Sequence, residues 1–89
     1  MQATSMVVHN KVGLHARPAA LFVQAALAHQ SKITVTNGEK SGNAKSILGI
    51  LSLGVQYNDR ITINADGPDE MEALTALTKL VENNFGEPL

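Results

Sequence analysis

The chain has 89 residues, enough for a single domain over residues 1–89 with a modest hydrophobic core. It has no cysteine, which excludes disulfides and thiolate metal sites. Its formal net charge is −1 and only 3% of its residues are aromatic, so it lacks the basic surface and stacking platforms of a nucleic-acid-binding protein. No apolar run approaches the roughly 20 residues that cross a bilayer. Residues 1–5 do not read as the start of a signal peptide, so we expect a cytoplasmic protein without membrane insertion.

The first part of the chain predicts one strand followed by one helix. A β-favouring run at Met6–Val8 predicts a strand within residues 2–9. The next element is predicted to be a helix over residues 16–28, with apolar residues around nearly its whole circumference. A domain this small cannot easily bury such a helix on all sides. We therefore expect an exposed apolar surface near its start, formed by Ala16, Ala20 and Leu21.

The middle of the chain predicts a hairpin followed by a short helix. Alternating apolar and polar residues predict a strand over residues 31–36. Asn37-Gly38 predicts a type I′ turn into a short polar return strand over residues 39–42. From residue 44 to 53 the apolar period changes to that of a helix, in which Gly49 is unfavourable by about 1 kcal/mol relative to alanine.

The last part predicts a strand over residues 60–65, in which the alternation places Ile61, Ile63 and Ala65 on the inward face. A helix then begins at Asp66-Gly67-Pro68, with Pro68 early in it. The apolar stripe of this helix comprises Ala73, Leu74, Leu77, Leu80, Val81 and Phe85, and Gly86 ends it. The order strand–helix–strand–strand–helix–strand–helix mixes hairpins with crossovers and predicts the α+β class. The architecture that fits is an open-faced β-sandwich, a four-stranded, mainly antiparallel sheet with three helices on one face.

Residues 13–20 read Gly-Leu-His-Ala-Arg-Pro-Ala-Ala and combine three chemical features. Gly13 permits a sharp turn, and Pro18 suits the first turn of a helix. His15 is therefore expected just before a helix N-terminus that attracts anions, where Arg17 adds a guanidinium suited to phosphate oxygens. These positive features are expected to disfavour the protonated ring and leave a neutral, nucleophilic imidazole. The residues alone leave two interpretations open, an anion-handling histidine and an incidental polar loop.

The segment Asn10–Ala20 resembles the active-site signature of HPr, the histidine-containing phosphocarrier family of the phosphoenolpyruvate-dependent sugar phosphotransferase system. A second segment, Asn43–Gly54, resembles the regulatory-serine signature of that family, and the chain length also matches. The resemblance implies a carrier rather than an enzyme, with no cofactor and no metal. It implies that His15 accepts a phosphoryl group on Nδ1 from enzyme I and passes it to a histidine of an enzyme IIA domain. Arg17 would stabilise the phosphate.

Two interpretations of Ser46 are compatible with the sequence. A serine before a helix is a favourable N-cap whether or not it is modified. The resemblance suggests a regulatory site for HPr kinase/phosphorylase, at which a phosphate would repel acidic partners from an adjacent apolar surface. The surface expected to bind partners comprises Ala16, Ala20, Leu21, Lys45, Ile47, Leu48 and Leu51.

Three further residues qualify this interpretation. His9 and His29 stand at no metal-ligand spacing and are expected at the surface. Val12 departs from the pattern of many relatives, which carry there a polar side chain able to hydrogen-bond the active-site ring.

Four functions are compatible with the sequence. The chain is a carrier of the sugar system, or a carrier of the nitrogen-related branch that uses the same chemistry. The full motif around Ser46 favours the sugar system. The other two are a regulatory binding protein switched only at Ser46, against which His15 and Arg17 count, and an α+β ligand-binding module without phosphoryl chemistry. We expect a monomer, because a carrier exposes one surface to successive partners.

Overall fold

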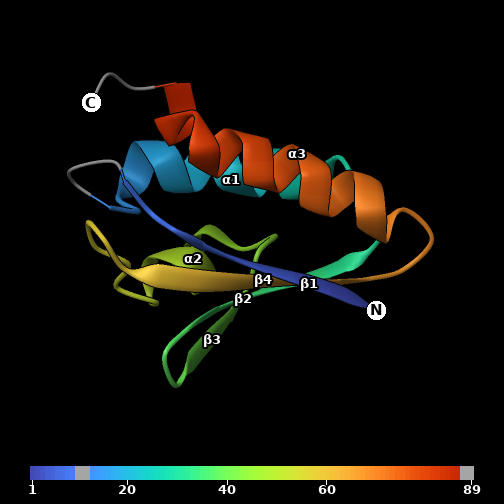
Figure 1. Ribbon diagram of the computed structural model, residues 1–89, viewed down its shortest axis with the longest axis horizontal. Coiled ribbons are helices and arrows are strands. Elements are labelled where there is room, and N and C mark those ends of the chain that lie inside the picture. The colour runs from blue at the N-terminus through green and yellow to red at the C-terminus, as the bar shows by residue number, and fades with distance from the viewer. Residues whose placement is uncertain (10–12, 87–89) are drawn as a thin grey trace.

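The computed structural model describes residues 1–9 and 13–86, which form one antiparallel sheet and its covering helices (Figure 1). The strands pair in the order β1-β4-β2-β3. The predicted sequence of elements and the open-faced sandwich are confirmed. The elements are β1 (Gln2–Val7), α1 (Ala16–Leu27), β2 (Lys32–Asn37), β3 (Lys40–Asn43), α2 (Ile47–Leu51), β4 (Arg60–Asp66), α3 (Glu70–Glu82) and a 3-10 turn over Asn84–Gly86.

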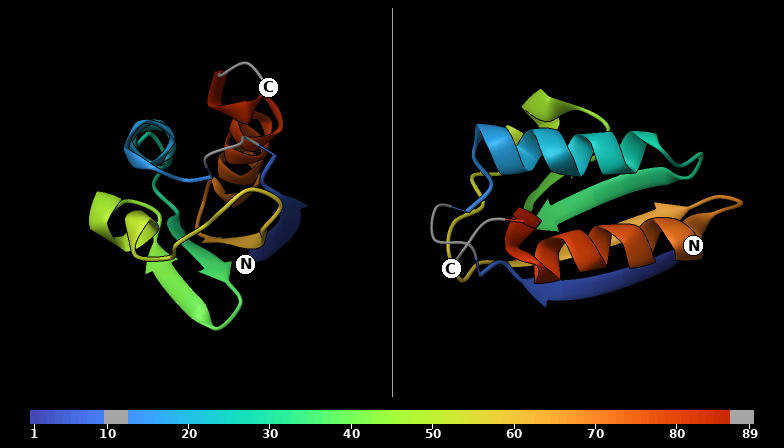
Figure 2. Two further views of the ribbon diagram at one scale, coloured as in Figure 1. Left: turned by 90° about the vertical axis from the view of Figure 1, so that its left-hand side faces the viewer. Right: turned by 90° about the horizontal axis from the view of Figure 1, so that it is seen from above.

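The helices cover one face of the sheet (Figure 2). α1 and α3 lie side by side, α3 packs against β1 and β4, and α2 packs against α1 and β3. The core forms between these helices and the inward side chains of β2 and β4, which alternate as predicted. Its largest fully buried hydrophobic side chains are Val8, Phe22, Ile33, Val35, Ile50, Leu53, Ile61, Ile63 and Leu77. Within the described residues, no helix combines the length and hydropathy of a membrane span.

The turn between β2 and β3 differs from the prediction by one residue. Asn37 pairs with Lys40, so the two-residue loop is Gly38–Glu39 and Asn37 is the last residue of β2. Gly38 has a φ of +63°, whereas Asn37 and Glu39 do not have positive φ. The predicted type I′ turn at Asn37-Gly38 is therefore wrong. The physical reason is tertiary, because the Asn37 side chain donates a hydrogen bond to the carbonyl oxygen of Leu53 at 3.0 Å.

The last helix also begins later than predicted. α3 starts at Glu70 with Asp69 as its N-cap, so Pro68 precedes the helix instead of lying in it. The backbone at Gly67 passes so close to Ser31 that a Cβ there would lie 2.7 Å from the Ser31 Cα. This contact fixes the turn before the helix. At the other end α3 stops at Glu82, and the buried Phe85 lies in the following turn with a φ of +56°.

The short helix α2 depends on two glycines. A Cβ at Gly42 would overlap the carbonyl oxygen of Gly49, and a Cβ at Gly49 would lie 3.0 Å from the carbonyl oxygen of Asn43. Gly49 lowers the intrinsic helix propensity. Its missing side chain is what lets α2 approach β3 this closely.

Asp69 joins three elements at the end of the molecule where α1 stops. Its carboxylate accepts hydrogen bonds from the backbone N–H groups of Gln30 (3.0 Å) and Ser31 (2.9 Å) and from the Ser31 hydroxyl. The Ser31 hydroxyl and these N–H groups lower the pKa of Asp69 from 3.8 to about 2, because they stabilise the charged form.

This low pKa predicts a specific acid sensitivity. A carboxylate whose pKa is lowered on folding stabilises the protein fully above its unfolded pKa, and that contribution disappears as the pH falls through the folded value. The Asp69 contribution should therefore be complete above about pH 4 and disappear between about pH 4 and pH 2. In thermal unfolding across this range, Asp69→Asn should show a shallower fall in Tm than the wild type. The pKa of Glu70 is also lowered, chiefly by the Gly67 N–H, so both proteins keep a residual acid dependence. Parallel curves for the two proteins would contradict the prediction.

Candidate functional site

His15 occupies the N-cap position of α1. Its backbone is extended, with φ −94° and ψ −169°, and its carbonyl oxygen accepts the helix hydrogen bond from the Ala19 N–H at 2.9 Å. The imidazole makes no capping hydrogen bond with the helix backbone, and the residue is exposed. The backbone of His15 therefore starts the helix while its ring faces solvent.

The first turn of α1 leaves its positive end uncompensated. No acidic residue lies in that turn. Pro18 is buried and is the third residue of α1. Its missing N–H costs nothing there, because the first N–H groups of a helix have no acceptor within the helix. The first N–H that donates within the helix is that of Ala19. The N–H groups of Ala16 and Arg17 come before it and can therefore donate to an external acceptor such as an anion.

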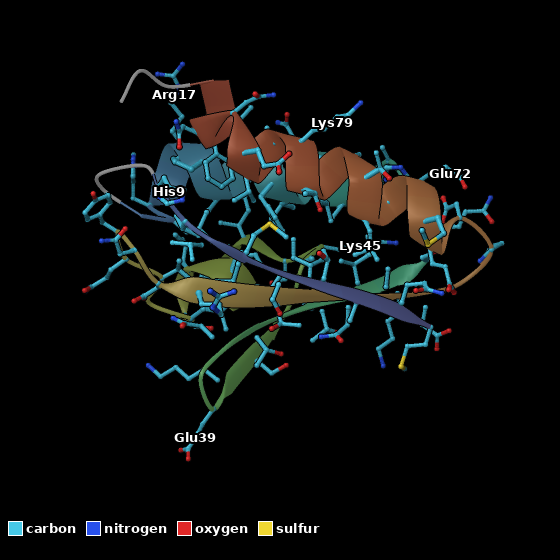
Figure 3. All side chains as sticks on the ribbon, in the orientation of Figure 1. His9, Arg17, Glu39, Lys45, Glu72 and Lys79 are labelled. Carbon is cyan, nitrogen blue, oxygen red and sulfur yellow. The ribbon has the colours of Figure 1, made fainter. Side chains whose placement is uncertain are left out.

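Arg17 adds a full positive charge to this end. Its side chain is exposed and points away from the sheet, at the end of the molecule where His9 also lies (Figure 3). Among the residues that the structure describes, the ion pairs formed by side chains do not include Arg17. A guanidinium without a carboxylate partner is suited to bind phosphate oxygens next to the His15 ring.

An apolar surface lies beside this site. Ile47, Leu48 and Leu51 are 44%, 80% and 37% exposed, respectively. They lie on α2, which packs directly against α1. On α1, Ala16 is exposed, whereas Ala20 and Leu21 are half-buried.

Helices α1 and α2 run in opposite directions, and this decides which residues of α2 lie nearer to His15. Lys45, before α2, contacts His29 after the end of α1, while Val55, after α2, contacts Leu14 before the start of α1. Leu51 therefore lies nearer than Ile47 to the His15 end of α1.

Lys45 lies toward the end of α1 that is opposite to His15. Its ammonium donates to the carbonyl oxygen of His29 at 2.7 Å, next to the C-terminal end of α1. Figure 3 shows Lys45 set back from the end that carries Arg17 and His9. A cation here stabilises the negative end of the helix dipole.

Ser46 forms the N-cap of α2, as one of its two interpretations predicts. Its Oγ accepts a hydrogen bond from the Gly49 N–H at 3.1 Å, and its backbone is extended with φ −123°. The residue is half-buried and directly precedes the exposed side chains of Ile47 and Leu48.

The remaining predicted residues divide between described and undescribed parts of the chain. Val12 lies outside the described residues. His9 is exposed, whereas His29 is half-buried and its Nδ1 lies 3.1 Å from the Ala25 carbonyl oxygen. Within residues 1–9 and 13–86, His, Asp and Glu form no group of three that could hold a metal ion.

The comparisons with known proteins agree with this arrangement. A family model described as the PTS HPr component phosphorylation site matches residues 2–83. The chain belongs to the HPr family. The phosphocarrier protein HPr of Mycoplasma genitalium is 42% identical over 85 residues, covering 94% of this chain and 97% of the relative.

Solved HPr structures have the same fold. An HPr structure from Thermoanaerobacter tengcongensis is 50% identical, covers 100% of both chains and superposes with a TM-score of 0.97. A chain of the HPr dimer from the same organism is also 50% identical, covers 98% of this chain and 100% of its own, and has a TM-score of 0.79. The protein is thus an HPr phosphocarrier of the phosphotransferase system, and the predictions of family and fold are confirmed.

Proposed function

We propose that His15 accepts a phosphoryl group on Nδ1 from a phosphohistidine of enzyme I and passes it to a histidine of an enzyme IIA domain. The observation that carries this proposal is the exposed His15 ring at an uncompensated helix N-terminus, beside the guanidinium of Arg17. Loading breaks the P–N bond on the donor histidine and forms a P–N bond to Nδ1 of His15. The His15 proton lies on Nε2 during this step, so that Nδ1 presents its lone pair. Unloading reverses these roles toward the acceptor histidine.

The carrier supplies anion binding, and its partners supply the alignment of donor and acceptor. Arg17 and the N–H groups of the first turn stabilise the dianionic phosphoryl oxygens on the loaded ring. In-line positioning and charge stabilisation dominate phosphoryl transfer, and a docked partner provides both. The apolar surface on α1 and α2 is where we place that docking.

Intact-mass spectrometry after incubation with phosphoenolpyruvate and enzyme I tests the acceptor. The wild type should gain one acid-labile phosphoryl adduct, and His15→Ala should gain none. His9→Ala is the matched control, because His9 is also exposed and lies at the same end of the molecule. It should still be phosphorylated. An adduct that survives in His15→Ala, or a wild type that takes none from a competent enzyme I, would contradict the proposal.

We also propose that phosphorylation of Ser46 by an HPr kinase/phosphorylase slows the loading of His15. Ser46 borders the exposed side chains of Ile47 and Leu48, so a phosphate there would place negative charge on the docking surface.

Ser46→Ala removes the N-cap and should cost about 1 kcal/mol of unfolding free energy. Ser46→Asp keeps a capping oxygen and adds charge. In urea unfolding and in enzyme I kinetics, we expect the alanine variant to lose stability and the aspartate variant to lose loading rate. Equal loading rates would contradict the regulatory role.

The finer assignments are part of the same proposal. We place the carrier in the sugar branch, because the motif around Ser46 is complete, and in the cytoplasm, where its partners would act. We propose a monomer in solution, although a relative from Thermoanaerobacter tengcongensis has been solved as an HPr dimer. Light scattering at increasing concentration tests this point, and a constant mass of one chain is expected. A protein switched only at Ser46 would not need His15 and Arg17, which this chain carries at the start of α1.

A further inference from the structure

The chain segment that follows α2 is hydrogen-bonded to residues on both sides of the loop between β1 and α1, after which His15 stands. We call residues 53–59 the support segment. Val8, directly after β1, donates its N–H to the Asp59 carbonyl oxygen at 2.9 Å, and its carbonyl oxygen accepts the Asn58 N–H at 2.8 Å. Leu14, directly before His15, donates its N–H to the Val55 carbonyl oxygen at 3.0 Å. The backbone positions on both sides of the loop therefore depend on where the support segment lies.

The Asp59 carboxylate closes the support segment on itself. Its Oδ2 accepts the Gln56 N–H at 2.9 Å, and the Asp59 N–H donates to the Gln56 carbonyl oxygen at 3.0 Å. The turn between them includes Asn58 with a φ of +70°, a conformation that asparagine adopts more readily than most residues. Without the carboxylate, the Gln56 N–H would lose its protein acceptor. Only one of the two hydrogen bonds between Gln56 and Asp59 would then hold the turn.

Asn37 ties the closed turn to the sheet. Its Nδ2 donates to the Leu53 carbonyl oxygen at 3.0 Å and lies 3.4 Å from the Asp59 Oδ2. These contacts join the first and last residues of the support segment to the end of β2. Asn37 and Asp59 thus connect the sheet to the segment on which Leu14 is held.

We infer that Asp59, together with Asn37, is a positioning residue for phosphoryl acceptance by His15, because it holds the segment that sets the backbone at Leu14. This inference rests on the proposed function of His15. Neither residue touches the phosphoryl group; they fix where the ring stands relative to the first turn of α1. Displacements of about 1 Å at a reacting group can cost up to about 100-fold in rate. Because the loop before His15 keeps its other contacts, we expect the rate of phosphoryl acceptance to fall by about tenfold.

The test compares Asp59→Ala with Asp69→Ala. Both variants remove a carboxylate that accepts backbone N–H groups, but Asp69 lies beyond the far end of α1, next to Gln30 and Ser31. With each variant as the substrate of enzyme I, Asp59→Ala should lower kcat about tenfold with little change in KM, because the docking surface is untouched. Asp69→Ala should lower stability in urea and leave kcat near that of the wild type. Equal effects of the two variants on kcat would overturn the inference.

A second readout does not require phosphoryl transfer. In NMR spectra of the histidine rings, Asp59→Ala should shift the His15 signals, while those of His29, at the other end of α1, should stay in place. Asn37→Ser, which loses the Nδ2 donor, should change both readouts in the same direction and by less, and it serves if Asp59→Ala does not fold. If the wild type takes no phosphoryl group, the proposed function fails while the NMR comparison still decides the positioning. Unshifted His15 signals in both variants would overturn the inference alone.

Discussion

Gly13→Ala is expected to lose about 3 kcal/mol of unfolding free energy. Gly13 has a φ of +68°, which already costs an alanine about 1 kcal/mol. A Cβ at this position would overlap the carbonyl oxygen of Val55 and lie 2.7 Å from the Cα of Gln56. Both neighbours are backbone atoms of the support segment, so no side-chain rotation relieves the overlap. The chain must move apart, and the hydrogen bond from Leu14 to Val55 is lost with it.

Gly38→Ala is the matched control for this effect. Gly38 has a similar φ of +63°, but nothing lies within 4 Å of its Cβ position. It should therefore lose only the conformational cost, about 1 kcal/mol. Urea unfolding of both variants measures the difference of about 2 kcal/mol that we attribute to the overlap. Equal losses would mean that the loop before His15 relaxes freely, which would also weaken the case for the support segment.

The sequence predicted most of the fold where the determining forces act between near neighbours. The alternation of Ile61, Ile63 and Ala65 predicted both the strand and its buried face, and all three residues are buried. The N-cap role of Ser46 followed from its place before an apolar helical run, and the hydrogen bond to Gly49 confirms it. In these places local propensity and tertiary packing favour the same structure.

The predictions failed where a distant contact decides the local structure. The turn after β2 is displaced by one residue because Asn37 is held by Leu53, which lies 16 residues further along the chain. Pro68 is outside α3 because Gly67 is pressed against Ser31. No short-range pattern encodes either contact.

The candidate site could likewise be predicted where neighbouring residues determine it, but not where distant contacts do. The order of residues predicted that His15 stands just before a helix start, and the structure places it at the N-cap of α1, with Arg17 in the first turn. Asn58-Asp59 predicts a turn, but the role inferred for Asp59 could not be predicted, because it depends on the distant contacts of this segment with Val8 and Leu14. The contact of the Lys45 ammonium with the carbonyl oxygen of His29, 16 residues earlier in the chain, could not be predicted either.

Leu48→Asp should weaken the interaction with enzyme I by about 100-fold while leaving the fold intact. Leu48 is 80% exposed on α2, so its replacement removes little buried area and should change stability by less than about 0.5 kcal/mol. In a docked complex the same position would be covered by the partner. An aspartate there would be an unpaired charge in an apolar contact, a cost of several kcal/mol in a fully buried interface. The expected effect is therefore on KM for the carrier, with kcat largely retained.

Met71→Asp provides the control for an exposed apolar residue elsewhere. Met71 is 55% exposed on α3, outside the surface shared by α1 and α2. Steady-state kinetics of enzyme I should give a raised KM for Leu48→Asp and an unchanged KM for Met71→Asp, with both proteins unfolding at wild-type urea concentrations. A raised KM for Met71→Asp with an unchanged KM for Leu48→Asp would place the docking surface on α3, which His15 does not adjoin. Equal, unchanged KM values would mean that α2 contributes no contact to docking, and that the charge at Ser46 would have to act on His15 in some other way.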